Sequence, residues 1–252
     1  MSDATLAARA LACLDLTDLN DACTEADVEA LCDRAQTPHG PVAAVCIWPR
    51  FVAAARRRLG NAPVRVATVM NFPHGGEAVA PVLDSVAAAL ADGAHEIDLV
   101  LPYRAFAEGR ADIAARMVDA VRAAAPGTVL KVILETGMLR EAPLIRRAAD
   151  LAIGEGADFV KTSTGKVEVN ATPEAVAVLI SAIAASQRPV GLKPAGGIRS
   201  LADAAGYIAQ TDAVMGRGWA QPARFRLGAS GVLAALIAAL GGDAAPAPAP
   251  GY

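Results

Sequence analysis

Short β-prone runs alternate with alanine-rich helical stretches along most of the chain, and this alternation limits the folds that it can adopt. Strands are predicted near 42–48, 64–70, 96–101, 129–135, 158–163, 189–194, 212–216 and 225–228, with helices over 77–92, 110–125, 140–155, 172–186 and 199–210. Eight strands alternating with helices over 252 residues are typical of an α/β protein with a closed (β/α)8 TIM barrel. An open doubly wound sheet is the alternative, but no GxGxxG turn follows the first strand.

The two ends of the chain do not continue this alternation. We expect one domain over 1–241, with 1–35 as an N-terminal helical extension, and a flexible Ala/Pro tail over 242–252 that ends in Tyr252. The apolar stretch 229–240 is too short to span a bilayer and predicts a buried helix. Asp3 and Arg9 interrupt the segment that a secretion signal would need, so we expect a cytoplasmic protein without membrane contact.

Charge and residue spacing weigh against several functional classes. The net charge is −3 and no basic patch stands out, which argues against a nucleic-acid partner. The cysteines lack CxxC spacing and are expected to be free thiols: Cys13, Cys23, Cys32 and Cys46. The histidines lack metal-ligand spacing, so we expect no metal and no cofactor: His39, His74 and His95.

Lysine is rare in this chain, and its placement is unusual. Of 23 basic residues, four are lysines: Lys131, Lys161, Lys166 and Lys193. Three of the four lie inside predicted strands, although lysine is seldom buried without a partner. A surface ion pair can use arginine or lysine, whereas chemistry that needs a deprotonatable amine requires lysine.

The period of the strands predicts which of these side chains meet. Side chains alternate between the two faces of a strand, and neighbouring parallel strands lie about 4.8 Å apart, so Lys161 and Lys193 are expected to be neighbours inside the barrel. Asp98 lies on one face of the strand near 96–101, and Lys131 and Glu135 share a face of the strand near 129–135. In a barrel the active site lies at the carboxyl ends of the strands.

A lysine pair of this kind favours covalent chemistry. An unperturbed lysine has a pKa of about 10.4, and a dry pocket and a neighbouring ammonium both lower it. A neutral amine can attack a carbonyl and form a Schiff base. The alternative is a buried structural network in which the lysines pair with Asp98 and Glu135. Two lysines and an acid at one barrel mouth favour chemistry.

Glycine turns after three predicted strands indicate an anion site. They are TGK (164–166), AGGIRS (195–200) and GAS (228–230), and the last two open helices. Backbone N–H groups at such turns bind phosphate well. Tight βα turns also need glycine, but three such turns with Lys166 and Arg199 nearby favour a phosphate site.

The motifs that carry these residues resemble those of the deoxyribose-phosphate aldolases, which are Schiff-base aldolases on a TIM barrel. They run in order along nearly the whole chain: DLTDLN (15–20), CIWPRF (46–51), NFPHG (71–75), EIDLVLPYRA (96–105), KVILETG (131–137), DFVKTSTGKVEVNATPE (158–174), GLKPAGGIR (191–199) and RLGAS (226–230). The pair KTSTGK and KPAGG is the most specific part of the resemblance.

The resemblance implies a reaction and a role for each matching residue. The reaction is reversible cleavage of 2-deoxy-D-ribose 5-phosphate to acetaldehyde and D-glyceraldehyde 3-phosphate, in deoxyribonucleoside catabolism. Lys161 matches the Schiff-base lysine, Lys193 the second lysine, Asp98 the acid of the proton relay and Asp15 a position that handles substrate hydroxyls. The matching phosphate positions are Gly165, Lys166, Gly196, Gly197, Arg199, Gly228 and Ser230. Cys46 matches a thiol that aldehydes attack, although a small apolar strand residue is an equally compatible interpretation.

The chain departs from the family in two places. Gly231 follows Ser230 where relatives often carry a second serine, and the tail before Tyr252 is richer in proline. The resemblance implies that Tyr252 enters the site and assists proton transfer; an incidental tyrosine at a disordered end is the alternative. Alternative functions are a related aldolase with other aldehydes, a non-catalytic phosphosugar-binding barrel and, less favoured, a metal-dependent aldolase. A homodimer is possible in this fold class.

Overall fold

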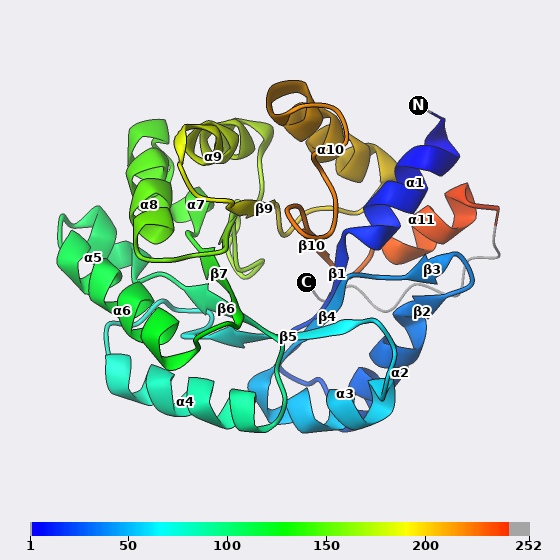
Figure 1. Ribbon diagram of the computed structural model, residues 1–252, viewed down its shortest axis with the longest axis horizontal. Coiled ribbons are helices and arrows are strands. Elements are labelled where there is room, and N and C mark those ends of the chain that lie inside the picture. Colours follow the sequence, from blue (N-terminus) through cyan, green and yellow to red (C-terminus); the bar gives the residue numbers. More distant parts are fainter. Residues whose placement is uncertain (1, 242–252) are drawn as a thin grey trace.

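Eight parallel strands form a nearly closed barrel at the centre of the computed structural model, which describes residues 2–241 (Figure 1). The order around the barrel is β10-β1-β4-β5-β6-β7-β8-β9. The strands are β1 (Leu14–Asp18), β4 (Ala44–Ile47), β5 (Arg65–Met70), β6 (Glu96–Val100), β7 (Val129–Ile133), β8 (Phe159–Lys161), β9 (Gly191–Lys193) and β10 (Leu227–Ala229).

Two isolated parallel bridges complete the barrel between β9 and β10. Leu192 pairs with Phe225, and Ala195 pairs with Gly228. The backbone N–H of Gly228 donates to the carbonyl of Pro194 at 2.9 Å. A Cβ on Gly228 would lie 2.7 Å from Cβ of Ala195, so the close approach of these two strands requires glycine.

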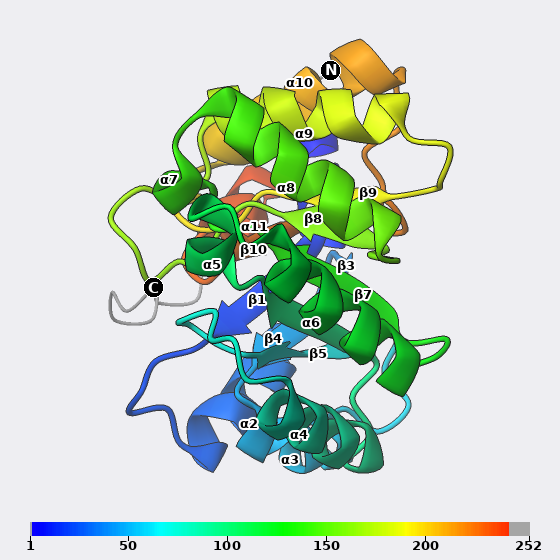
Figure 2. The same ribbon diagram turned by 90° about the vertical axis from the view of Figure 1, so that its left-hand side faces the viewer.

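Helices surround the strands, with α8, α9 and α10 on one side of the barrel and α2, α3 and α4 on the opposite side (Figure 2). The helices that follow the strands are α3 (Val52–Leu59), α4 (Val79–Ala91), α6 (Ala111–Ala124), α8 (Ala142–Gly154), α9 (Pro173–Ala185), α10 (Leu201–Met215), α11 (Leu233–Ala239) and, after β1, α2 (Glu25–Arg34). Shorter elements lie in the connections: η1 (Pro49–Phe51), α5 (Tyr103–Ala107), α7 (Thr136–Leu139) and the hairpin β2 (Gln36–Thr37) with β3 (Gly40–Pro41).

Local sequence signals explain where the helices near the site begin. Thr172 caps α9 by accepting from the backbone N–H of Ala175, and Pro173 occupies the first helical position, as predicted. Ser200 and Asp203 form a capping box at the start of α10. These caps fix the points at which the loops after β8 and β9 leave the barrel mouth.

The prediction for the N-terminal region was wrong in one respect. The segment 1–35 contains the first barrel strand, β1, between two helices, and only α1 (Asp3–Ala12) precedes the barrel. The sequence LDLTD has two aspartates, which are depleted in strands, so propensity did not indicate it. Both Asp15 and Thr17 are buried, because the barrel interior at this point is charged.

The predicted strand near 212–216 was also wrong, because α10 continues through Met215. The helix ends at Gly216, whose φ of 102° stops it. A short apolar run is compatible with either a strand or a helix on periodicity alone. The other seven predicted strands lie at barrel strands, the last one shifted to Leu227–Ala229. The prediction of eight strands was right in number because one strand was missed and one was added.

The main hydrophobic core lies between the strands and the helices, and the barrel interior is divided into two halves. Small apolar side chains fill the half beneath β4 and β5: Leu19, Ala44, Cys46, Ala67 and Val69. Charged side chains from β6, β7, β8 and β9 fill the other half. This division places the polar chemistry of the interior on one side of the barrel.

Candidate active site

The charged half of the interior is a network of buried cations and carboxylates. The parallel register pairs Asp98 with Lys131 and Lys161 with Lys193 across neighbouring strands, as the sequence predicted for the two lysines. Each side chain of the network is at least nine-tenths buried: Asp15, Glu96, Asp98, Lys131, Lys161, Lys193 and Arg226. Three carboxylates therefore face four basic groups.

Asp98 is the centre of this network because it contacts all three lysines. Its Oδ1 accepts from Lys131 Nζ at 2.7 Å, and its Oδ2 accepts from Lys161 Nζ at 2.9 Å and from Lys193 Nζ at 2.7 Å. Burial alone would raise the pKa of Asp98, but the three ammonium groups outweigh it and hold this pKa well below its usual range. Asp98 is therefore ionised at neutral pH, and one of its oxygens bridges Lys161 and Lys193.

The three buried lysines are held unequally. Lys131 lies 2.6 Å from Glu96, 2.7 Å from Asp98 and 3.8 Å from Asp15. Lys193 lies 2.5 Å from Asp15 Oδ2 and 2.7 Å from Asp98 Oδ2. Within the described residues, Lys161 forms one ion pair, with Asp98. Lys161 is therefore the amine that the carboxylates hold least.

Lys193 is the strongly protonated member of the bridged pair. Burial disfavours its charge, but Asp15 and Asp98 outweigh burial and raise the pKa of Lys193 well above its ordinary value. A neighbouring ammonium beside Lys161, which the sequence predicted, is thus present. Asp98 lies between the two amines as a shared acceptor, and this acceptor is the part of the arrangement that the face pattern alone did not specify.

The deep end of the network contains two residues that sequence reasoning did not assign to the site. Arg226 donates to Asp15 at 2.7 Å and to both oxygens of Glu96 at 2.8 and 3.0 Å. The signal that could have indicated it is an arginine inside the predicted last strand. Asp15 has one oxygen at Arg226 and the other at Lys193, so it fixes Lys193 from below. A contact from Asp15 to substrate hydroxyls stays a prediction.

Cys46 lies beside the network, on β4. Its Sγ is 4.0 Å from Asp98 Oδ2, and the side chain is fully buried. Burial raises the pKa of the Cys46 thiol, although Lys193 opposes this. Both interpretations of the sequence are thus compatible with the position, because Cys46 packs in the small apolar cluster and also contacts the charged centre.

The glycine turns predicted to bind phosphate come together at one edge of the barrel mouth. The N–H of Gly196 donates to the carbonyl of Gly228 at 3.1 Å, which joins the turns after β9 and β10. A Cβ on Gly196 would lie 2.7 Å from Oδ1 of Asn170, so the turn after β8 packs against the same glycine. Gly165, Gly196 and Gly197 all have positive φ, between 80° and 84°.

The charged and hydroxyl groups predicted for the phosphate site lie around these turns. Lys166 is exposed, and its Nζ lies 3.7 Å from Asp21 in the connection after β1. Arg199 is exposed, and its backbone N–H donates to Asp203, which occupies the N-terminus of α10. That helix end is therefore filled by a carboxylate, so the glycine N–H groups are its remaining anion donors. Ser230 is half-buried, three residues before α11.

Ser163 was not assigned a role from the sequence, although it shares a strand face with Lys161. Its Oγ is buried and has no hydrogen-bond partner among the described residues. A buried hydroxyl without a partner inside a site is a candidate for contact with substrate or water. Alternation along β8 from Lys161 was the signal that could have found it.

Several sequence expectations concern features outside this geometry. Tyr252 lies outside the described residues. Within the part of the chain that the structure describes, no group of three or more His, Cys, Asp and Glu side chains could hold a metal ion, and all four cysteines are free. No helix among residues 2–241 is long and apolar enough to cross a membrane.

A lysine-centred network at the carboxyl ends of barrel strands, beside glycine turns, defines an aldolase-type lyase site on a TIM barrel. Comparison with known proteins narrows this class. The family described as DeoC/LacD family aldolase matches residues 9–222, and the chain belongs to this family.

Known relatives agree with this assignment in sequence and in fold. The chain is 51% identical over 248 residues to the deoxyribose-phosphate aldolase of Agrobacterium fabrum, covering 98% of this chain and 96% of the relative. A crystal structure from Toxoplasma gondii, described as a deoxyribose-phosphate aldolase, superposes with a TM-score of 0.85 at 28% identity, covering 94% and 95% of the two chains. One from Coccidioides immitis gives 0.81 at 30% identity, covering 90% and 85%.

Proposed function

We propose that this aldolase cleaves 2-deoxy-D-ribose 5-phosphate reversibly to acetaldehyde and D-glyceraldehyde 3-phosphate through a Schiff base on Lys161. The observation that carries the proposal is the shared oxygen of Asp98, which lies 2.9 Å from Lys161 Nζ and 2.7 Å from Lys193 Nζ. The 51% identity to a deoxyribose-phosphate aldolase supports the choice of substrate.

Lys161 is the nucleophile because it loses a proton at the lowest cost. The network has four basic groups and three carboxylates, and Lys161 contacts one carboxylate where Lys193 contacts two and Lys131 three. A nucleophilic amine must be neutral when it attacks, and each carboxylate contact favours the charged form. Asp98 and Lys193 then lie within hydrogen-bond distance of the attacking nitrogen.

In the cleavage direction, Lys161 Nζ adds to the aldehyde carbon of the open-chain sugar and water leaves, which gives an iminium. A base removes the proton of the C3 hydroxyl, the C2–C3 bond breaks, and its electron pair moves to the iminium to form an enamine. D-Glyceraldehyde 3-phosphate leaves. A proton is then added to C2, and hydrolysis releases acetaldehyde and Lys161.

We assign the proton relay to Asp98, Lys193 and bound water. Because the pKa of Asp98 is held far below neutrality and that of Lys193 lies well above it, the ammonium of Lys193 is the proton reservoir and Asp98 orients both amines. We assign phosphate binding to the turns that meet at Gly196, with Lys166 and Ser230 at their edge. Cys46 remains our candidate for the thiol that aldehydes attack.

Mass spectrometry after borohydride reduction tests the proposal. The protein is incubated with deoxyribose 5-phosphate, reduced and digested, with Lys161→Arg as the variant that keeps the charge. A reduced adduct on Lys161, absent in the variant, is expected. An adduct on Lys193 or Lys131 would overturn the role of Lys161. No adduct with phosphosugar binding intact would indicate a non-catalytic binding barrel, and an adduct formed only with other aldehydes a related aldolase.

Two further predictions rest on the resemblance alone. Tyr252 is expected to assist protonation of the enamine, so Tyr252→Phe should slow exchange of acetaldehyde methyl protons with D2O; an unchanged exchange rate would exclude this role. A homodimer is expected from light scattering on the purified protein, and a monomer mass would contradict it. The protein is expected to act in the cytoplasm.

A further inference from the structure

Glu135 combines features that are uncommon for a glutamate. It lies at the carboxyl end of β7, directly before α7, with φ of 57° and ψ of 58°. Residues other than glycine seldom adopt this left-handed conformation, which costs about 1–3 kcal/mol unless the surroundings hold it. Its side chain is completely buried. A strained backbone beneath a buried carboxylate points to a specific task for this side chain.

The carboxylate of Glu135 holds the first residue of the predicted phosphate turn. Its Oε2 accepts from Thr164 Oγ1 at 2.5 Å, and its Oε1 accepts from the backbone N–H of Thr164 at 3.2 Å. The Thr164 hydroxyl in turn accepts from the backbone N–H of Lys166 at 3.0 Å. An ionised carboxylate can only accept, so the hydroxyl must donate to Glu135 and its lone pairs are left for Lys166. Glu135 thereby sets the direction of the whole chain of hydrogen bonds.

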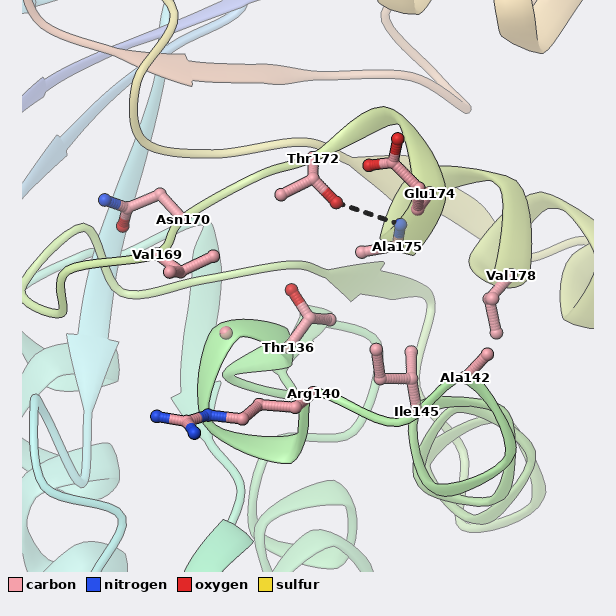
Figure 3. A pocket seen from close by; sticks show the side chains of 11 residues that line it. Thr136, Arg140, Ala142, Ile145, Val169, Asn170, Thr172, Glu174, Ala175 and Val178 are labelled. Carbon is pink, nitrogen blue, oxygen red and sulfur yellow. Dashed lines mark hydrogen bonds between the residues drawn. The ribbon is translucent and has the colours of Figure 1, made fainter.

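The end of the same segment rests on the residue two places after Glu135. A Cβ on Gly137 would lie 1.9 Å from the carbonyl oxygen of Val169, so the backbone of Val169 lies directly on Gly137. The Nδ2 of Asn170 donates to the carbonyl of Val167 at 3.1 Å, which closes the segment into a compact loop. Figure 3 shows Val169 and Asn170 on the strip of chain that passes over α7.

This loop has little apolar packing behind it. A cavity of about 300 Å³ lies between Val169, Asn170 and the helices α7, α8 and α9 (Figure 3). Thr136 faces this cavity, and its buried Oγ1 has no hydrogen-bond partner among the described residues. Because the loop borders a hollow on this side, its conformation depends on the contacts from Glu135 and Gly137.

We propose that Glu135 is a positioning residue that makes the enzyme selective for phosphorylated substrates, because it holds the Thr164–Lys166 turn where the phosphate is received. This inference rests on the proposed function and deepens it. Glu135 acts through Thr164 and does not itself bind the substrate. Lys161, on the neighbouring strand, is left to react with the aldehyde end of the substrate whether or not a phosphate is present.

The test compares Glu135→Gln with Glu141→Gln, a matched exchange at an exposed position on the same stretch of chain. An amide can accept through one atom only, so Glu135→Gln cannot keep both contacts to Thr164. We expect kcat/KM for deoxyribose 5-phosphate to fall roughly 10- to 100-fold, mainly through KM, as for the loss of a hydrogen bond to a charged group. For unphosphorylated deoxyribose we expect a fall of less than about threefold, and Glu141→Gln should leave both substrates unchanged.

Two measurements separate failure of this inference from failure of the proposed function. Binding of inorganic phosphate, measured by calorimetry, should weaken about tenfold or more in Glu135→Gln whichever sugar the enzyme cleaves. Borohydride trapping of acetaldehyde on Lys161 should be unchanged in the variant, because acetaldehyde has no phosphate. If the wild type forms no such adduct, the Schiff-base function fails, while the phosphate measurement still decides the role of Glu135.

Equal losses for the phosphorylated and unphosphorylated sugars would overturn the inference, since they would indicate a general effect on fold or chemistry. Unchanged phosphate binding would overturn it as well. If Glu135→Gln does not fold, Thr164→Val removes the same link from the other side and should show the same selective loss. A Thr164→Val variant with wild-type phosphate binding would contradict the proposed link.

Discussion

Replacing each buried lysine by methionine should separate the nucleophile from the structural lysines by stability rather than by activity. In Lys161→Met, Asp98 keeps Lys131 and Lys193, both at 2.7 Å. The network then has three basic groups and three carboxylates. Exchanging a buried charge for an apolar side chain of similar volume is often neutral or stabilising. We therefore expect the free energy of unfolding to stay within about 1 kcal/mol of the wild type or to increase.

Lys193→Met should behave in the opposite way. It removes the contact of 2.5 Å to Asp15 and that of 2.7 Å to Asp98, so two buried carboxylates each lose a cation. Removing one partner of a buried ion pair costs about 3–5 kcal/mol. For a chain of this size that corresponds to a fall in Tm of roughly 6–20 °C. Activity is expected to be lost in both variants, so the difference in stability carries the information.

The assay is urea unfolding followed by circular dichroism, with thermal unfolding as a second measurement. Lys166→Met provides a control with the same exchange outside the network, since its surface ion pair with Asp21 at 3.7 Å contributes less than about 1 kcal/mol. If Lys161→Met destabilises the protein as much as Lys193→Met, the surplus of charge does not lie at Lys161, and our reason for choosing this nucleophile is wrong.

Three other predictions follow from the same contacts. The ammonium groups hold the pKa of Asp98 below its usual value despite burial, so stability present above about pH 4 should decrease as the pH falls further; the urea midpoint between pH 6 and 3 should fall less steeply in Asp98→Asn, and an equal slope would contradict this. Gly228→Ala would place a Cβ 2.7 Å from Cβ of Ala195 and 3.2 Å from Cε of Lys193, and should cost about 1–3 kcal/mol in thermal unfolding, whereas Gly231→Ala, which has open space around it, should be neutral. Cys46→Ala should slow inactivation by acetaldehyde, measured as residual activity over time, whereas Cys32→Ala, also buried, should not; equal protection by both would exclude a special role for Cys46.

The sequence predicted the parts of the fold that follow from periodicity and missed those that depend on the barrel interior. Alternating runs located seven strands, and the face pattern placed Lys161 beside Lys193. The strand β1 was missed because its inward residues are Asp15 and Thr17, which indicate a strand only once the interior is known to be charged. The segment 212–216 was misassigned because five residues do not distinguish a strand from the last turn of a helix.

The candidate site divides in the same way. Spacing along single strands predicted Lys161, Lys193 and Asp98, because residues two apart share a face. It did not predict Arg226, which reaches Asp15 and Glu96 from strands distant in sequence, nor Glu135, whose role depends on a left-handed backbone. Long-range partners and strained dihedrals are properties of the assembled barrel. The positions of Gly196 and Gly228 were predicted, but their direct contact was not.

The sequence left two interpretations of the buried lysines open, a structural network or covalent chemistry, and the structure shows why they belong together. The carboxylates that would make a structural network are present, and they are shared unequally among the amines. An iminium on Lys161 carries the same positive charge as the ammonium that it replaces, so Asp98 can stabilise it at 2.9 Å without rearrangement of Lys131 or Lys193. A more strongly held lysine would stay protonated, and an unpaired one would lose this stabilisation of the iminium. A single shared carboxylate contact is therefore the arrangement that lets an amine give up its proton and still be stabilised as a cation afterwards.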